Sequence, residues 1–155
     1  MKNRRIVLAS RPSGEASTAN FRLETVDTPA LAAGQVLVRN RWLSVDPYMR
    51  MRMNDAKSYA EPVAVGAVMV GGTAGEVVES RHEAFKAGDT VVAQGGWQEL
   101  SVLDATQKAA LRKVDTSRVP LQAYLGAVGM PGVTAWIGLV HFIEPKPGET
   151  IVVDA

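Results

Sequence analysis

One stretch decides the fold: Leu43-Ser44-Val45-Asp46-Pro47-Tyr48-Met49-Arg50-Met51-Arg52-Met53. Its first residues continue a strand, which ends at Pro47 because proline has no N–H to donate to a sheet ladder. We expect a turn and a short helix after Pro47, so that Tyr48 lies at the mouth of the strand. A phenol there combines an apolar ring with an O–H that donates or accepts a hydrogen bond, and Arg50 and Arg52 place cations close by.

These three residues also have a simpler interpretation. A tyrosine that follows a proline is more often a packed surface residue than a chemical one, and arginines on a short helix are commonly solvated charges. The pattern alone therefore leaves Tyr48 open as a candidate catalytic and substrate-pocket residue, with Arg50 and Arg52 as weaker candidates.

Three strands are expected before Pro47. The first covers residues 4–10 and ends at a turn marked by proline and glycine. The second covers residues 21–25 and the third residues 36–42, where apolar and polar side chains alternate with the period of a half-buried strand. The third strand leads directly to Tyr48.

The residues after the short helix predict a loop and then a curved sheet. Residues 54–62 are polar, and we expect them to border the site that Tyr48 faces. Glycines then interrupt strand-like sequence from Val63 to Ser80, which predicts bulges, sharp bends or the close passage of a second backbone. Phosphate binding is a competing explanation of these glycines, but they precede another strand rather than a helix N-terminus.

Two further elements complete the predicted β unit. Residues 90–93 and 97–102 are expected to pair as a hairpin across Gly95 and Gly96. Asp104 is expected to cap a short helix from Ala105 to Leu111. Residues 1–118 are therefore predicted to form a mainly β, partly open barrel.

The pattern changes to helical spacing from Pro120 onward. One helix is expected to end at Gly129, and Pro131 suits the first turn of another helix over residues 132–142, which is apolar on more than one side. Residues 149–153 then resemble the start of a buried parallel strand, which needs neighbours on both sides. We therefore expect residues 119–155 to comprise linking helices and the first strand of a second, truncated domain.

Composition narrows the classes of function. Lys and Arg number 17 against 16 Asp and Glu. The chain therefore lacks the excess of positive charge that would indicate a nucleic-acid or membrane partner. The chain has no apolar run of membrane-spanning length and no signal-peptide core, and we expect it in the cytoplasm. It has no cysteine, which excludes disulfides and thiolate ligands, and His82 and His141 lack the spacing of a metal pair.

Several motifs occur in an order typical of one family. They are Asn20-Phe21-Arg22-Leu23-Glu24, Asp46-Pro47-Tyr48-Met49-Arg50, Val68-Met69-Val70-Gly71-Gly72-Thr73, and Gly129-Met130-Pro131-Gly132 followed by Thr134-Ala135. On these residues the chain resembles the medium-chain dehydrogenase/reductase superfamily. It is most similar to the zinc-free branch of NADPH-dependent alkenal, enone and prostaglandin-type double-bond reductases.

The resemblance implies a fold and a set of site residues. It implies a GroES-like barrel that continues, after residues 151–153, into a Rossmann domain, and a homodimeric full-length protein. Tyr48 would be the catalytic residue, donating a hydrogen bond in the substrate pocket. Met130 would line that pocket and also lie beside the nicotinamide of NADPH, and Thr134 would offer its hydroxyl to the nicotinamide carboxamide. Simple helix packing explains the presence of both residues equally well. Gly72 and Thr73 stand where zinc-dependent relatives carry a His-Glu pair, so no metal is expected.

The implied function is NADPH-dependent reduction of the carbon–carbon double bond of α,β-unsaturated aldehydes and ketones. These 155 residues alone are expected to be inactive, because most of the NADPH surface would lie in the second domain. Two alternatives stay open at this point. In the first, the chain is a stand-alone barrel that acts as a binding or interaction module. In the second, it is part of a quinone or alcohol reductase of the same superfamily.

Overall fold

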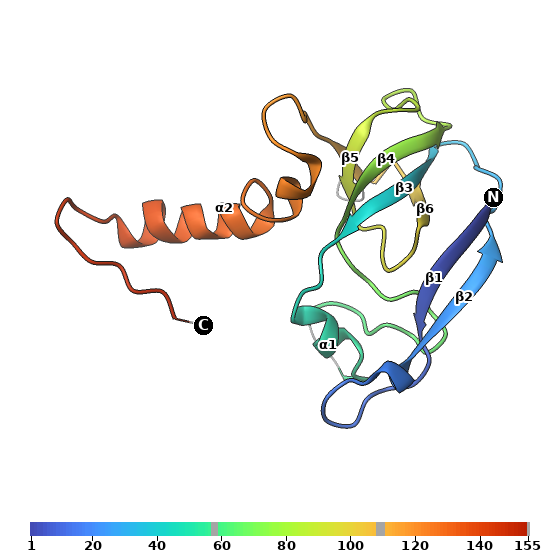
Figure 1. Ribbon diagram of the computed structural model, residues 1–155, viewed down its shortest axis with the longest axis horizontal. Coiled ribbons are helices and arrows are strands. Elements are labelled where there is room, and N and C mark those ends of the chain that lie inside the picture. Colours follow the sequence, from blue (N-terminus) through green and yellow to red (C-terminus); the bar gives the residue numbers. More distant parts are fainter. Residues whose placement is uncertain (57–58, 108–110, 155) are drawn as a thin grey trace.

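A curled five-stranded antiparallel sheet forms the centre of the molecule (Figure 1). The structure is a computed structural model that describes residues 1–56, 59–107 and 111–154. The strand order is β6-β3-β4-β5-β7. Their bounds are β3 Gln35–Leu43, β4 Thr73–Ser80, β5 Thr90–Ala93, β6 Leu100–Asp104 and β7 Leu111–Lys113.

A separate antiparallel ribbon lies beside this sheet. It consists of β1 (Lys2–Leu8) and β2 (Phe21–Asp27), with the short 3₁₀ helix η1 (Thr18–Asn20) before β2. β1 begins and ends two residues earlier than predicted. Together the ribbon and the curled sheet form a mainly β half-barrel, which confirms the predicted fold class.

The curvature of the sheet arises where β3 and β4 pair. Their register shifts twice, between Leu37 and Val38 and between Asn40 and Trp42. Gly75 lies opposite Asn40 at the second shift, and a Cβ atom on Gly75 would lie 2.2 Å from the carbonyl oxygen of Arg39. The prediction that a second backbone passes close to a glycine in this segment is therefore confirmed at Gly75.

Two apolar clusters hold the half-barrel together. The first lies inside the curled sheet and comprises Val36, Val38, Val77, Val91, Ala93 and Leu111. The second lies under the helix α1 (Tyr48–Arg52) and comprises Leu8, Met49, Met53, Val63 and Met69. Because the second cluster draws on β1, on α1 and on the segment before β4, it fixes α1 against the barrel.

The predicted hairpin between residues 90–93 and 97–102 is wrong. β5 pairs with β4 and β7, whereas β6 pairs with β3 on the other side of the sheet. The chain leaves the sheet after Ala93, and the N–H of Trp97 donates to the carbonyl of Met69 at 2.8 Å. Hydrogen bonds of this kind, to a segment distant in the sequence, replace the ladder that a hairpin would have formed.

The predicted helix from Ala105 to Leu111 is also wrong in its described part. Asp104 accepts hydrogen bonds from Thr106 and Gln107, as a capping aspartate does, but residues 105–107 form only a turn. Leu111 begins β7, and its side chain is buried in the first apolar cluster. Burial of Leu111 against β5 overrides the local helical preference. Residues 108–110 of the prediction lie outside the described residues.

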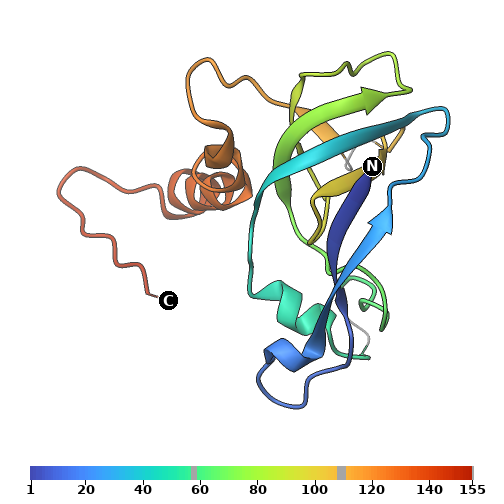
Figure 2. The ribbon, with the colours of Figure 1, turned by 45° about the vertical axis from the view of Figure 1, so that its right-hand side comes forward.

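Three helical segments follow the half-barrel, where the spacing predicted two helices. They are the 3₁₀ helix η2 (Leu121–Leu125), the α-helix α2 (Met130–Ile137) and the π-helix η3 (Gly138–Ile143). η2 contacts β4 and β5, whereas α2 projects from the barrel (Figures 1 and 2). None of the described helices is long and apolar enough to cross a membrane.

The residues after η3 differ from the prediction of a strand. Residues 151–154 form no strand, and Val152 and Val153 are 83% and 90% exposed. A β-strand exists through ladder hydrogen bonds, and no described segment lies beside these residues to provide them. Several apolar side chains of α2 and η3 are exposed as well, among them Met130, Val133, Trp136 and Phe142.

Candidate functional site

The short helix α1 begins directly after Pro47, where the sequence predicted it, but β3 ends at Leu43 rather than at Pro47. Pro47 supplies the N-cap position with helical dihedral angles, and the Met49 N–H donates to the Asp46 carbonyl at 3.1 Å. The Ser44 hydroxyl donates to the Asp46 carboxylate at 3.0 Å, which fixes the chain before the proline. β3 therefore delivers Tyr48 to the edge of the barrel, as expected.

The position of α1 is set by contacts at both ends. The side chains of Met49 and Met53 are buried in the second apolar cluster. A guanidinium N–H of Arg11 donates to the Met53 carbonyl at 2.7 Å and to the Val63 carbonyl at 3.3 Å. The Val63 N–H in turn donates to the Arg52 carbonyl at 2.7 Å. Of the loop predicted at residues 54–62, the described residues 59–62 thus return beside α1, as expected for a loop that borders the Tyr48 site.

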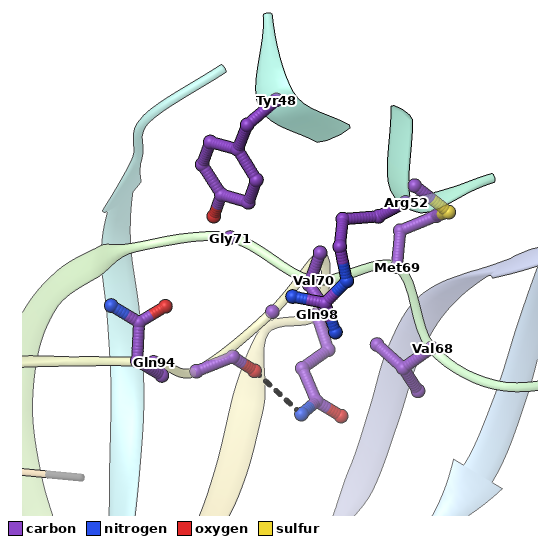
Figure 3. A pocket seen from close by; sticks show the side chains of 10 residues that line it. Tyr48, Arg52, Val68, Met69, Val70, Gly71, Gln94 and Gln98 are labelled. Atoms are coloured by element: carbon purple, nitrogen blue, oxygen red, sulfur yellow. Dashed lines mark hydrogen bonds between the residues drawn. The ribbon is translucent and has the colours of Figure 1, made fainter. Parts of the chain in front are cut away.

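A cavity of about 490 Å³ lies in front of α1 (Figure 3). Two residues of α1 and two segments of the barrel line it. The lining residues are Tyr48, Arg52, Val68, Met69, Val70, Gly71, Gln94, Gly95, Gly96 and Gln98. Figure 3 shows the Tyr48 hydroxyl directed toward Gly71, with the Gln94 carboxamide on the same side of the cavity. The size is typical of small-molecule sites.

The barrel side of the cavity is a backbone layer that holds distant segments together. The Gly96 N–H donates to the Gly71 carbonyl at 3.0 Å, and the Ile6 N–H donates to the Trp97 carbonyl at 2.8 Å. Gly96 adopts φ +72°, and a Cβ atom there would lie 2.8 Å from the Met69 carbonyl oxygen. Only glycine satisfies both conditions, so Gly96 lets residues 94–98 pass close to residues 68–71.

A buried polar network sits behind this layer at Gly95. Ser101, which is fully buried, donates its hydroxyl to the Gly95 carbonyl at 2.9 Å and accepts from the Asn40 carboxamide at 2.7 Å. The Gly95 N–H donates to the Thr73 hydroxyl at 3.2 Å. Three side chains from three strands therefore fix the backbone that lines the cavity.

The electrostatic environment keeps the Tyr48 phenol neutral. Partial burial raises the pKa of Tyr48 above its ordinary value of 10.0, and the nearby Asp46 carboxylate raises it further. The Arg52 guanidinium acts in the opposite direction but is a smaller influence. At neutral pH Tyr48 is therefore a phenol that can donate its proton in a hydrogen bond to an oxygen acceptor.

The structure separates the two arginines that sequence reasoning treated together. The Arg50 guanidinium donates to the Gly14 carbonyl at 3.1 Å and to the Asn54 carboxamide oxygen at 2.7 Å, and Arg50 does not line the cavity. Arg52 lines the cavity beside Tyr48. The available signal was the spacing of four residues between Tyr48 and Arg52, which places both on one face of a helix.

Met130 and Thr134 lie on α2 and do not line the Tyr48 cavity. Met130 is 68% exposed at the start of the helix. The Thr134 hydroxyl donates to the Met130 carbonyl at 2.9 Å, so its oxygen still has acceptor capacity. Their assignment to substrate and cofactor contacts stays a prediction.

The residues considered for metal binding make other contacts. His82 Nδ1 accepts from the Ala84 N–H at 3.1 Å, and the His141 ring packs edge-on against Trp136. Thr73 is buried and belongs to the Gly95 network. Residues 1–56, 59–107 and 111–154 contain no group of three or more His, Cys, Asp or Glu side chains placed to hold a metal ion.

Sequence reasoning missed Gln94 and Gln98 as cavity residues. Gln94 belongs to the expected hairpin connection and Gln98 to its expected second strand, and nothing local to either residue indicates that the segment returns to β1. Gln98 is held structurally, because its carboxamide donates to the Gly95 carbonyl at 2.7 Å. Gln94 is exposed, and its carboxamide faces the cavity (Figure 3).

Comparison with known proteins agrees with this architecture. Residues 4–111 match the family described as the N-terminal domain of oxidoreductase. The NADPH-dependent curcumin reductase of Escherichia coli (strain K12) is 48% identical over 154 residues, which are 99% of this chain and 44% of that protein. The 2-alkenal reductase (NADP(+)-dependent) of Nicotiana tabacum is 35% identical over 159 residues, covering 100% of this chain and 46% of the relative.

A solved structure shows that the similarity extends to the three-dimensional fold. The crystal structure of CurA in complex with NADPH from Vibrio vulnificus superposes with a TM-score of 0.83 and 45% identity. The match covers 94% of this chain and 42% of that protein. The chain therefore spans less than half the length of the relatives that it matches.

Proposed function

The chain belongs to the medium-chain dehydrogenase/reductase family as the N-terminal domain of an oxidoreductase, and from this we propose that the full-length protein is an NADPH-dependent enone reductase. It reduces the carbon–carbon double bond of α,β-unsaturated aldehydes and ketones, and this domain forms the substrate side of the active site. The observation that carries the proposal is a neutral, partly buried phenol, Tyr48, directed into a cavity whose other walls are largely apolar and backbone. The relatives that bear the names curcumin reductase and 2-alkenal reductase support the choice of substrate class.

The chemistry assigned to Tyr48 follows from where charge develops. Addition of hydride to the β-carbon of an enone moves negative charge onto the carbonyl oxygen. A donor already placed at that oxygen stabilises the developing charge without having to reorganise. The raised pKa of Tyr48 keeps its proton available at neutral pH, so the phenol binds the carbonyl and steadies the enolate.

The residues assigned to the cofactor carry groups that fit those of NADPH. NADPH, when bound, supplies the hydride. The Thr134 hydroxyl already donates to the Met130 carbonyl, so its oxygen fits the N–H of a nicotinamide carboxamide as an acceptor. Met130 is exposed and apolar, which fits a wall against a ring. We propose these roles for Met130 and Thr134, and no metal takes part.

Substrate preference distinguishes this proposal from a quinone or alcohol reductase. We expect the full-length protein to oxidise NADPH rapidly with a 2-enal or an enone, and at least about 10-fold more slowly with a quinone, a factor that corresponds to roughly 1.4 kcal/mol in the barrier. Absorbance of NADPH measures the rate, and mass spectrometry of the product identifies the saturated carbonyl. A faster quinone rate, or an allylic alcohol as product, would contradict the assignment.

A polypeptide of these 155 residues is expected to bind NADPH weakly or not at all. A dinucleotide site typically places the pyrophosphate at a helix N-terminus after a strand and a glycine-rich turn. In the described part of the chain, α2 follows η2 rather than a strand, so its N-terminus lacks the setting of a pyrophosphate site. The residues of α2 assigned to NADPH are Met130 and Thr134 alone. Titration followed by nicotinamide fluorescence should show no saturation at micromolar NADPH, and saturable micromolar binding would refute the prediction.

The interaction-module alternative expects the helix over residues 132–142 to be buried against the barrel. No residue of α2 or η3 is buried, so no observation favours that alternative. The homodimeric state and cytoplasmic location of the full-length protein stay predictions, as does the division of the chain at residues 118 and 119.

A further inference from the structure

Among the described residues that line the Tyr48 cavity, Arg52 is the one that carries a charge. Of the ten described residues that line it, the other nine are neutral: one phenol, two carboxamides, three apolar side chains and three glycines. A charge beside apolar walls is less screened than one in open water. The cavity therefore attracts a ligand that carries negative charge, which an unsubstituted aldehyde or ketone does not.

The Arg52 guanidinium is held in place with donors to spare. Its Nε donates to the Glu61 carbonyl at 2.6 Å, which anchors the side chain to the loop beside α1. Figure 3 shows the guanidinium directed into the cavity, which Val70 and Gln98 also line. Guanidinium has five N–H donors, and no carboxylate in the described part of the chain lies within 4.0 Å of those of Arg52.

Tyr48 and Arg52 are placed to contact two different groups of one ligand. They stand four residues apart on α1, so their side chains leave the same face of the helix about 6 Å apart along its axis. An enone whose carbonyl oxygen binds Tyr48 can place a second group at Arg52. The planar fork of arginine matches a carboxylate, which accepts two parallel hydrogen bonds from it.

We propose that Arg52 is a specificity-determining residue that binds a carboxylate on the substrate, so that the enzyme prefers enones bearing a carboxylate. The inference rests on the proposed function, since Tyr48 places the enone end. It goes further in naming the second group of the substrate and the residue that recognises it.

A matched pair of substrates tests the proposal in the full-length enzyme. One is a medium-chain 2-enal whose far end carries a carboxylate, and the other is its methyl ester. We expect Arg52→Gln to lower kcat/KM for the acid about 10- to 100-fold and for the ester less than about 3-fold, because a hydrogen-bonded charge pair is lost only with the acid. Arg52→Lys keeps the charge without the fork and should restore part of the preference.

Arg50→Gln is the matched control. It removes the same charge from the same helix, but Arg50 contacts Gly14 and Asn54 outside the cavity. The ratio of acid to ester should therefore stay at the wild-type value. An equal loss for acid and ester in Arg52→Gln would overturn the proposal, because the guanidinium would then contact the enone group that both substrates share.

Binding without turnover separates this inference from the proposed function. If the wild-type enzyme reduces neither substrate, the enone reductase assignment fails, and calorimetric titration with the saturated carboxylate decides the role of Arg52. Binding to wild type that is lost in Arg52→Gln and kept in Arg50→Gln supports the carboxylate site. Absence of binding to wild type, or equal binding to both variants, overturns it.

Discussion

Tyr48→Phe in the full-length enzyme is expected to lower kcat for an enone about 100-fold, which is the effect of removing one donor to a developing oxyanion. The phenylalanine ring keeps the packing of Tyr48 against the second apolar cluster, so the fold should be unchanged. Only the O–H directed into the cavity is lost. Steady-state kinetics with NADPH at saturation measures kcat and KM separately, and circular dichroism confirms that the variant is folded.

The pH dependence provides an independent readout of the same group. The phenol acts in its protonated form, so activity that depends on it is complete below the Tyr48 pKa and lost as pH rises through it. Because burial raises this pKa, the midpoint of the alkaline decline of wild-type kcat should lie above the ordinary value of 10.0. The residual activity of Tyr48→Phe should lack this decline. A variant that keeps more than about a third of wild-type kcat would show that another group provides the donor.

Local chemistry explains which parts of this structure were predictable. β3 ends at Leu43, and Pro47 starts α1 through its own backbone restrictions, so the position of Tyr48 follows from the residue before it. The alternation in β2 and β3 predicted the strands themselves but not their buried faces, because Leu23 is 63% exposed and Val36, Leu37 and Val38 are buried in succession. The fold class and the candidate phenol could therefore be identified without coordinates.

The remainder depends on contacts between segments far apart in the sequence. Residues 94–98 were expected to form the connection and the start of the second strand of a hairpin, but they pair with β1 and with residues 68–71 because those partners satisfy their backbone groups. No local pattern specifies such a choice. The inclusion of Gln94 in the site follows from that pairing, and the role of Arg52 follows from the direction of a helix only five residues long.

Gly95→Ala is expected to destabilise the cavity wall by about 2 kcal/mol, within the usual cost of adding a methyl group to a packed core. A Cβ atom on Gly95 would lie 2.4 Å from the Thr73 hydroxyl, 2.7 Å from the Ser101 hydroxyl and 2.8 Å from the Asn40 carboxamide oxygen. Thr73 and Ser101 are buried and hydrogen-bonded to residue 95 itself, so neither can move aside without losing those bonds. Amide exchange of residues 94–101 in the full-length enzyme should become roughly 30-fold faster, the factor that corresponds to this free energy.

Gly72→Ala is the control that separates crowding from the general effect of replacing a glycine. A Cβ atom on Gly72 has its nearest neighbour, a methyl group of Leu125, at 3.9 Å, which is ordinary contact. Its replacement should be neutral or stabilising by a few tenths of a kcal/mol, because alanine restricts the unfolded chain. Since residues 94–98 also line the cavity, Gly95→Ala should raise KM for the enone and Gly72→Ala should not. Equal exchange rates and equal KM in the two variants would mean that the Asn40, Thr73 and Ser101 network does not hold the wall against which the substrate binds.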